Sequence, residues 1–178
     1  KIILMKGSKG SPQTAQFMTA IDSDTNNLNV TVRSITGQNS SPCTVTNFPL
    51  QKWVHVCVVV NNRTVDVYID GKLERSCVMP DIPASQSSAN SRVYICRTAQ
   101  ETSSSGYVGG FFGQISRVQY YSSALDPAQV MDIYSDGPST QSSPFLRGMT
   151  DRVKGMYKGL SGDLRCASDN VHHETSSW

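Results

Sequence analysis

The sequence predicts an all-β antiparallel sandwich with one short helix near residues 126–135. Segments rich in Val, Ile and aromatic residues recur along the first 137 residues, and Gly, Asn, Asp, Ser or Pro bound each of them. One segment carries the start and stop signals of a helix. Many short strands at turn-punctuated spacing, followed by a single helix, favour a β-sandwich over an α/β fold.

The clearest local structure is a pair of hairpins between Trp53 and Met79. A strand ends at Val60, an Asn-rich turn follows, and the alternating segment Val65–Ile69 comes next. Asp70-Gly71 is the dipeptide typical of a type I′ turn, so we expect three antiparallel strands here. The complete set of predicted strands is Ile2–Lys6, Ala15–Ile21, Leu28–Ser34, Trp53–Val60, Val65–Ile69, Lys72–Met79, Arg92–Cys96 and Phe112–Tyr121.

The predicted helix has a defined beginning and one apolar face. Asp126 is a natural N-cap and Pro127 fits the first helical position. Val130, Ile133 and Tyr134 then fall on one side of the helix, and a Gly-Pro pair stops it.

The chain changes character after residue 137, so we expect a sandwich domain at 1–137 and a linker with a mostly irregular tail at 138–178. A Ser/Pro-rich stretch leads to apolar residues at helical spacing, with Arg and Lys between them. This pattern fits either a mobile tail or a basic amphipathic segment that orders on a protein partner or, less favoured, on a membrane surface. The candidate contact residues are Phe145, Leu146, Met149, Val153, Met156 and Leu160.

Charge and composition exclude several classes of protein. Lys and Arg number 16 against 14 Asp and Glu, which excludes an electrostatic nucleic-acid binder. No apolar run approaches the ~18 residues of a membrane-spanning helix. The chain begins at Lys1, inside what reads as a strand, so we expect it to be a processed product or part of a longer protein.

The five cysteines show no CxxC and no Cys/His spacing suited to zinc, so we predict no structural metal site. Cys57 and Cys96 lie in strand-like runs, where a thiol is most often a small buried apolar group. The spacing leaves open whether any disulfide forms and which cysteines would form it.

Several segments resemble the laminin G-like domains of the concanavalin A-like lectin/glucanase jelly rolls. The resemblance covers about residues 1–137, and its middle part is similar to a subgroup found in large DNA viruses of eukaryotes. It implies a jelly-roll sandwich. Independently of the resemblance, Trp53 opens a predicted strand, and its large apolar area can seal the sandwich edge. The segments that carry the resemblance are Trp53–Val56, Val65–Leu73, Arg75–Pro80, Val93–Ile95, Gly110–Ser116, Tyr120-Tyr121, Ala124-Leu125 and Ile133-Tyr134.

The sequence departs from this family in strand number. Such jelly rolls usually need more strands than 137 residues supply, so we expect strands before Lys1 to be missing. Their absence would leave sheet edges open, and open edges invite pairing with another chain.

The acidic residues argue against an enzyme. Glycosidases need two positioned carboxylates, and the glucanases of this fold carry paired acidic residues on one strand. Glu74, Glu101 and Glu174 are scattered. Asp66, Tyr68 and Asp70 share one strand face, but Asp70 belongs to the turn. His55 is the one histidine of the domain, and we predict a hydrogen-bonded structural role for it. We therefore predict no catalytic residues.

No cofactor is predicted, although the sequence leaves a surface calcium ion open. Residues 22–27 alternate acidic and amide side chains as in a calcium loop. Arg33 stands where an EF-hand has its twelfth-position Glu, so this motif fails and an Asx-rich turn is the preferred interpretation.

Two functions from different classes fit the sequence. The preferred one is a non-enzymatic assembly module, such as a minor capsid or surface component of a virus-like particle, that binds protein subunits through sandwich edges and tail. The alternative is a carbohydrate-binding, lectin-like adhesion domain. Both predict a virion or an extracellular surface assembly as the location. The candidate residues for contact with a glycan or partner are Tyr107, Phe111, Phe112, Tyr120 and Tyr121.

Overall fold

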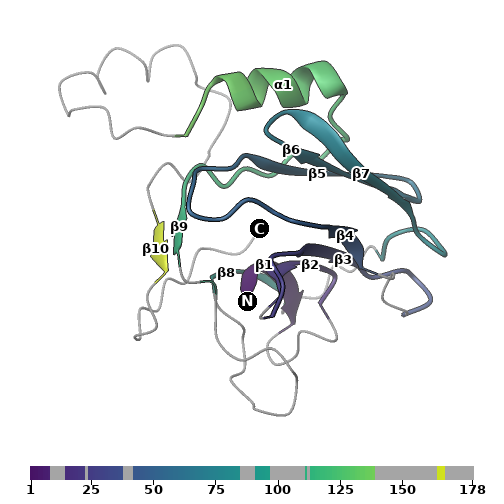
Figure 1. Ribbon diagram of the computed structural model, residues 1–178. Coiled ribbons are helices and arrows are strands. Elements are labelled where there is room, and N and C mark those ends of the chain that lie inside the picture. Colours follow the sequence, from purple (N-terminus) through teal and green to yellow (C-terminus); the bar gives the residue numbers. More distant parts are fainter. Residues whose placement is uncertain are drawn as a thin grey trace.

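Two antiparallel sheets lie face to face, and a single helix covers the outer side of the smaller one (Figure 1). The structure is a computed structural model that describes residues 1–8, 15–22, 24–37, 42–84, 91–96, 111, 113–138 and 164–166. The predicted all-β sandwich with one short helix is confirmed. Among the described residues, no helix has the length and apolar character needed to cross a bilayer.

The larger sheet has five strands in the order β4-β3-β2-β1-β8. All neighbouring strands in it run antiparallel. Its strands are β1 (Ile2–Ser8), β2 (Phe17–Ile21), β3 (Leu28–Val32), β4 (Cys43–Val45) and β8 (Ser91–Ile95).

The smaller sheet has three strands in the order β5-β6-β7, and it is the hairpin pair that the sequence predicts. Asp70 and Gly71 both have positive φ, at 50° and 77°, as a type I′ turn requires. The strands are β5 (Val56–Asn61), β6 (Thr64–Ile69) and β7 (Lys72–Val78).

The main core lies between the two sheets and follows strand alternation. Leu28, Val30 and Val32 of β3 are buried on the inner face, opposite Val65 and Val67 of β6. Burying each such side chain contributes roughly 1.5–3 kcal/mol. The alternation therefore fixes which face of each sheet points inward.

A disulfide joins the two sheets along one side of the sandwich. Cys43 of β4 bonds Cys77 of β7, with 5.8 Å between their Cα atoms and 34 residues of sequence separation. Cys57 is a free thiol in β5, as predicted. The expectation for Cys96 is wrong, because this residue follows β8 with a φ of 63° and is disulfide-bonded.

The helix α1 (Pro127–Ser135) is confirmed where its signals predict it. Asp126 accepts a hydrogen bond from the Gln129 backbone N–H at 2.8 Å, and the Gln129 side chain accepts one from the Asp126 N–H at 2.9 Å. This capping box satisfies two N–H groups that a helix start leaves open. Val130 is fully buried against Val59 and Tyr68 of the smaller sheet.

The observed strands differ from the predicted ones at several points. The predicted strand Phe112–Tyr121 shortens to β9 (Gly113–Ile115), because Arg117 adopts a φ of 54° that ends an extended run. β5 begins at Val56 rather than Trp53, and Trp53 is 49% exposed, so it does not seal the sandwich edge. The three-residue strand β4 was not predicted.

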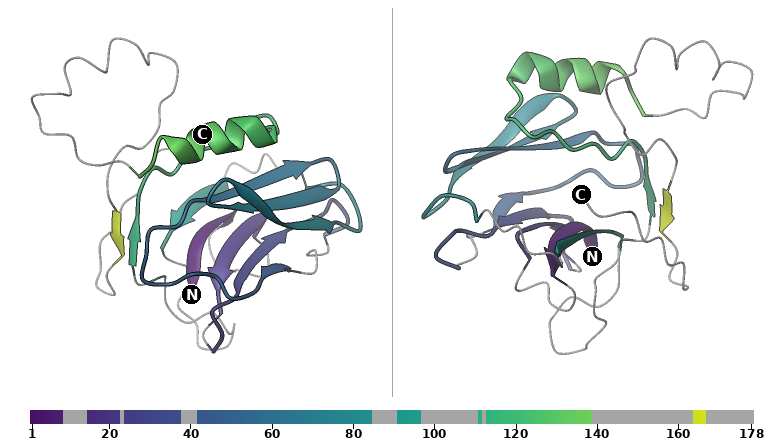
Figure 2. Two further views of the ribbon diagram at one scale, coloured as in Figure 1. Left: turned by 45° about the horizontal axis from the view of Figure 1, so that its top comes forward. Right: turned by 180° about the vertical axis from the view of Figure 1, so that it is seen from behind.

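A short strand of the C-terminal segment lies beside the sandwich. β10 (Leu164–Cys166) pairs antiparallel with β9, and Figure 2 shows this ribbon next to the two sheets. The predicted tail contacts from Phe145 to Leu160 lie outside the described residues.

Removing the inter-sheet disulfide should destabilise the domain. The double variant Cys43→Ala/Cys77→Ala frees a loop of 34 residues, which costs about 3–4 kcal/mol in the chain-entropy treatment. Urea unfolding measures this loss, and Cys57→Ala serves as the control because that thiol is unbonded. Equal stability of the double variant and the control would contradict a bond between the sheets.

Truncating Val130, the buried residue of α1, should weaken the packing of the helix on the smaller sheet. Val130→Ala removes two methyl groups from a fully buried position and should lower the free energy of unfolding by about 2 kcal/mol. Asp132→Ala on the exposed side of the same helix should change it by less than about 0.5 kcal/mol. Thermal unfolding distinguishes the two, and similar losses would show that α1 does not depend on this contact.

Candidate functional site

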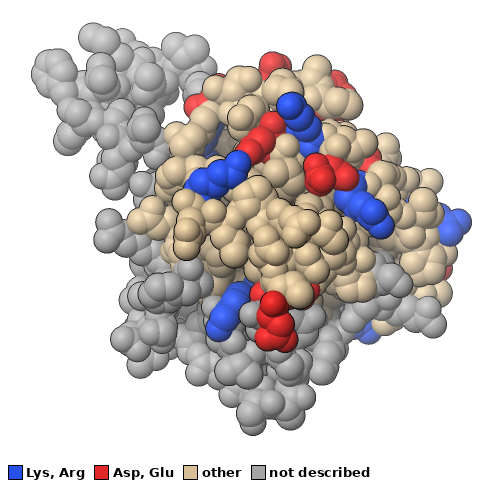
Figure 3. Space-filling model, in the orientation of Figure 1, with Lys and Arg blue, Asp and Glu red and all other residues tan. Residues whose placement is uncertain are grey.

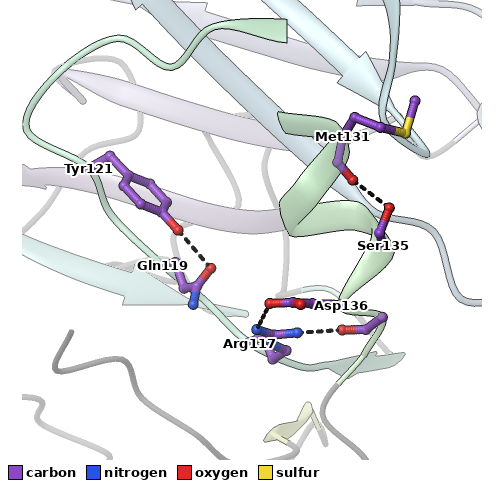
Figure 4. A network of polar contacts seen from close by, with 7 residues as sticks. Arg117, Gln119, Tyr121, Met131, Ser135 and Asp136 are labelled. Atoms are coloured by element: carbon purple, nitrogen blue, oxygen red, sulfur yellow. Dashed lines mark hydrogen bonds and ion pairs between the residues drawn. The ribbon is translucent and has the colours of Figure 1, made fainter. Parts of the chain in front are cut away.

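The structure does not bring the described members of the predicted aromatic set together into one binding platform. Phe111 packs against the main core, and its backbone N–H donates to the Ile2 carbonyl at 2.9 Å. Tyr121 is half-buried and donates its hydroxyl to Gln119 at 3.2 Å, as Figure 4 shows, whereas Tyr120 is 85% exposed. Tyr107 and Phe112 lie outside the described residues.

The two edge strands of the smaller sheet differ in character. β7 carries the charged residues Lys72, Glu74 and Arg75, and the β6–β7 register shifts between Val67 and Tyr68. Charges and a bulge are the usual means of preventing an edge from pairing with another chain. The Cys43–Cys77 bond also ties β7 to the larger sheet, so this side of the sandwich is closed.

The β5 edge has none of these protections. Its sequence, Val-Cys-Val-Val-Val-Asn, contains no charged residue, and β6 is its one sheet neighbour among the described residues. Val58 packs toward the main core, while Cys57 and Val59 belong to the cluster under α1. Both faces of β5 are therefore apolar, and most of its side chains are only half-buried.

A second feature is the contact between the C-terminal end of α1 and the segment that leads into β5. The His55 N–H donates to the Asp70 carboxylate at 2.9 Å, and the Asp70 N–H donates to the His55 carbonyl at 2.9 Å. The His55 ring faces the Tyr134 ring of α1, with 5.9 Å between centroids. Its Nδ1 is buried without a hydrogen-bond partner, so the predicted hydrogen-bonded histidine is wrong for that ring nitrogen.

The hairpin turn below α1 needs a glycine for two reasons. Gly71 has a φ of 77°, which residues with a side chain rarely adopt. A Cβ atom there would also meet the Met131 sulfur at 2.9 Å and Tyr134 Cδ1 at 3.0 Å. The absent side chain lets the last turns of α1 lie directly on the turn.

Arg117 holds the C-terminal end of α1 from the other side. Its guanidinium donates to the Gly137 carbonyl at 2.7 Å and to the Asp136 carboxylate at 3.1 Å (Figure 4). A cation near the last carbonyl groups of a helix also opposes the negative end of the helix dipole.

Trp53 precedes His55 by two residues, and Val54 between them packs against the main core. Trp53 and Tyr134 are 49% and 40% exposed, and Lys52, the sequence neighbour of Trp53, forms an ion pair with Asp70 at 3.8 Å. We call these residues with His55 the helix-end site. Sequence reasoning missed it, because only the fold brings Tyr134 over His55.

Burial governs the titration of His55 and of the Cys57 thiol. Burial holds the pKa of His55 below its ordinary value. The Asp70 charge raises this pKa, and the Arg117 charge lowers it. Burial likewise raises the pKa of the Cys57 thiol, which makes it a weak nucleophile.

Two carboxylates of the smaller sheet are engaged by neighbouring residues. Asp66 accepts a hydrogen bond from Ser76 at 2.5 Å, and Asp70 is engaged by His55 and Lys52. Glu101 and Glu174 lie outside the described residues. On the face in Figure 3, acidic and basic side chains are interspersed without a large area of one sign.

The predicted calcium loop has the contacts of a polar turn. The Asp22 carboxylate accepts hydrogen bonds from Thr25 at 2.9 Å and from Asn29 at 2.6 Å. Within the described part of the chain, no three acidic, His or Cys side chains form a cluster that would hold a metal ion.

Comparison with known proteins places the fold. None of the curated proteins matches the sequence. An S-layer domain-containing protein from Clostridium thermocellum, residues 221–444, has a similar structure at a TM-score of 0.40 and 18% identity. The match covers 75% of this chain and 62% of that one. Residues 1–131 match the laminin G-like family described as the concanavalin A-like lectin/glucanases superfamily. The chain therefore belongs to this superfamily.

Proposed function

We propose that this protein is a non-enzymatic binding module that joins protein subunits in a surface or extracellular assembly. The observation that carries the proposal is the contrast between the two edges of the smaller sheet. β7 is charged, bulged and tied down by a disulfide, whereas β5 is uncharged and lacks a sheet neighbour on its outer side among the described residues. Only the second edge suits the addition of a strand.

The chemistry of β5 defines the partner. An added strand would bond to the β5 backbone and place alternate side chains toward the main core and toward α1, as Val58 and Val59 do. A strand buried on both faces reads as a continuous apolar run rather than an alternating one. The partner is therefore an uncharged, extended segment of another protein molecule, and β5 of a second copy of this chain has that character.

The finer form of this proposal is a minor component of a virus-like capsid. It rests on the resemblance of the middle of the domain to a subgroup from large DNA viruses. The apolar residues between Phe145 and Leu160 would supply a second contact with the particle. Each could contribute roughly 1.5–3 kcal/mol on docking, before the cost of ordering the segment.

Hydrogen-exchange and sedimentation measurements on this chain test whether the β5 edge pairs with another strand. With rising protein concentration, sedimentation should report association, and hydrogen exchange should slow at β5 amides while β7 amides stay unchanged. Asn61 and Val78 flank Thr64 on opposite edges at the same level of the sheet. Asn61→Lys should weaken association about tenfold, or about 1.4 kcal/mol, whereas Val78→Lys should not. A chain that stays monomeric, or equal effects of the two variants, would refute this use of β5.

A second candidate function is glycan binding at the helix-end site. Trp53 and Tyr134 are half-exposed aromatic side chains, and Lys52, next to Trp53 in the sequence, pairs with Asp70, which bonds to His55. Half-exposed rings with a few polar groups nearby are typical of sites for small polar ligands with apolar faces, such as sugars.

Substitution of the tryptophan tests this alternative on a glycan array. If glycans bind at the helix-end site, Trp53→Ala should lower binding about tenfold, because the stacking surface is removed. Tyr120→Ala is the matched control, since Tyr120 is a more exposed aromatic residue outside this site. Binding lost with Tyr120→Ala and kept with Trp53→Ala would place the sugar elsewhere.

A further inference from the structure

The C-terminal half of α1 is held on the smaller sheet by three anchors. These are the turn at Gly71, the His55 ring against Tyr134, and the Arg117 guanidinium on the helix end. Beneath the helix lie Val59 and Tyr68, with the free thiol of Cys57 packed beside them. The position of α1 therefore controls access to the outer face of β5 and β6.

His55 is the anchor whose charge changes in mildly acidic water. When neutral, its ring tolerates burial with an unpaired Nδ1. When protonated, both ring nitrogens become donors that need partners. The Asp70 charge favours the protonated ring, but its carboxylate already accepts from the His55 N–H and pairs with Lys52. Arg117, paired to Asp136, is a second cation that opposes protonation. The tilted Tyr134 ring leaves the buried Nδ1 without a hydrogen-bond partner.

We propose that protonation of His55 releases the C-terminal half of α1 and exposes the outer face of the smaller sheet. The domain then carries an acid-opened latch, which can operate whether or not the edge contact proposed above forms.

The direction of the pH effect follows from linkage. The docked state binds the proton more weakly than the released state, where the imidazole has its ordinary pKa of 6.5. Above that pH both states are neutral, and docking has its full stability. As the pH falls below 6.5, the released state takes up the proton first, so docking weakens until the docked histidine also titrates.

The reactivity of Cys57 reports the latch in the full-length chain. 4,4′-Dithiodipyridine serves as the probe, peptide mapping by mass spectrometry assigns the modified cysteine, and the rate is divided by that of the unfolded chain at the same pH. We expect the Cys57 rate to rise as the pH falls through 6.5, by at most about tenfold for each unit by which docking lowers the pKa. Protein concentrations at which sedimentation shows a monomer keep this result independent of the β5 edge.

Variants of the three histidines separate the latch from general acid effects. His55→Asn keeps a neutral side chain and should give a Cys57 rate that does not rise with acid. His172→Gln/His173→Gln removes the other two histidines and should leave the rise intact. Tyr134→Ala should give fast labelling even at neutral pH, because one anchor is lost.

Two results would overturn the latch. One is an acid-dependent rise of equal size in His55→Asn and in the unsubstituted chain. The other, which needs no variant, is an NMR titration in which the His55 ring has an undisturbed pKa and the α1 signals do not change with it.

Discussion

The smaller sheet depends on the central strand β6, which is packed on both faces and paired along both edges. Val65 and Val67 point into the core between the sheets, and Tyr68 points outward under α1. β5 and β7 bond to its two sides. A one-residue slip of β6 would turn valines toward the helix and Tyr68 into the core. The register set by the Asp70-Gly71 turn therefore decides where the helix, the disulfide and both edges lie.

Features with short sequence separation were predictable. The Asp70-Gly71 turn and the Asp126 cap act on residues within a few positions, so their signals are complete in the local sequence. The pairing of Cys43 with Cys77 was not predictable, because β4 and β7 belong to different sheets and only the complete fold brings them together. β4 itself has only three residues and forms through its pairing with β3. Short strands of this kind depend on their neighbours rather than on their own propensity.

The candidate sites were harder to predict for the same reason. Tyr134 was expected on the apolar face of the helix, but that face is narrow: Val130 is fully buried and Tyr134 is 40% exposed. His55 was expected to have a hydrogen-bond partner, because buried polar atoms usually have one. Its backbone makes the contacts with Asp70 instead, and the ring is left to pack on Tyr134. Residue type and spacing do not show which atoms of a residue the fold engages.

The proposed edge and the proposed latch share β5, so they are energetically coupled. Cys57 and Val59 show that one side of β5 gains its burial from the cluster under α1. A strand added at this edge would place alternate side chains on the same side and depend partly on the helix for their burial. Release of α1 would expose those side chains to water and remove part of their contribution, roughly 25 cal/mol for each Å² of apolar surface. By reciprocity, a bound strand would stabilise the docked helix and lower the pKa of His55 further. Acidification would then loosen the edge contact rather than promote it. The effect would act through α1, because His55 lies outside β5.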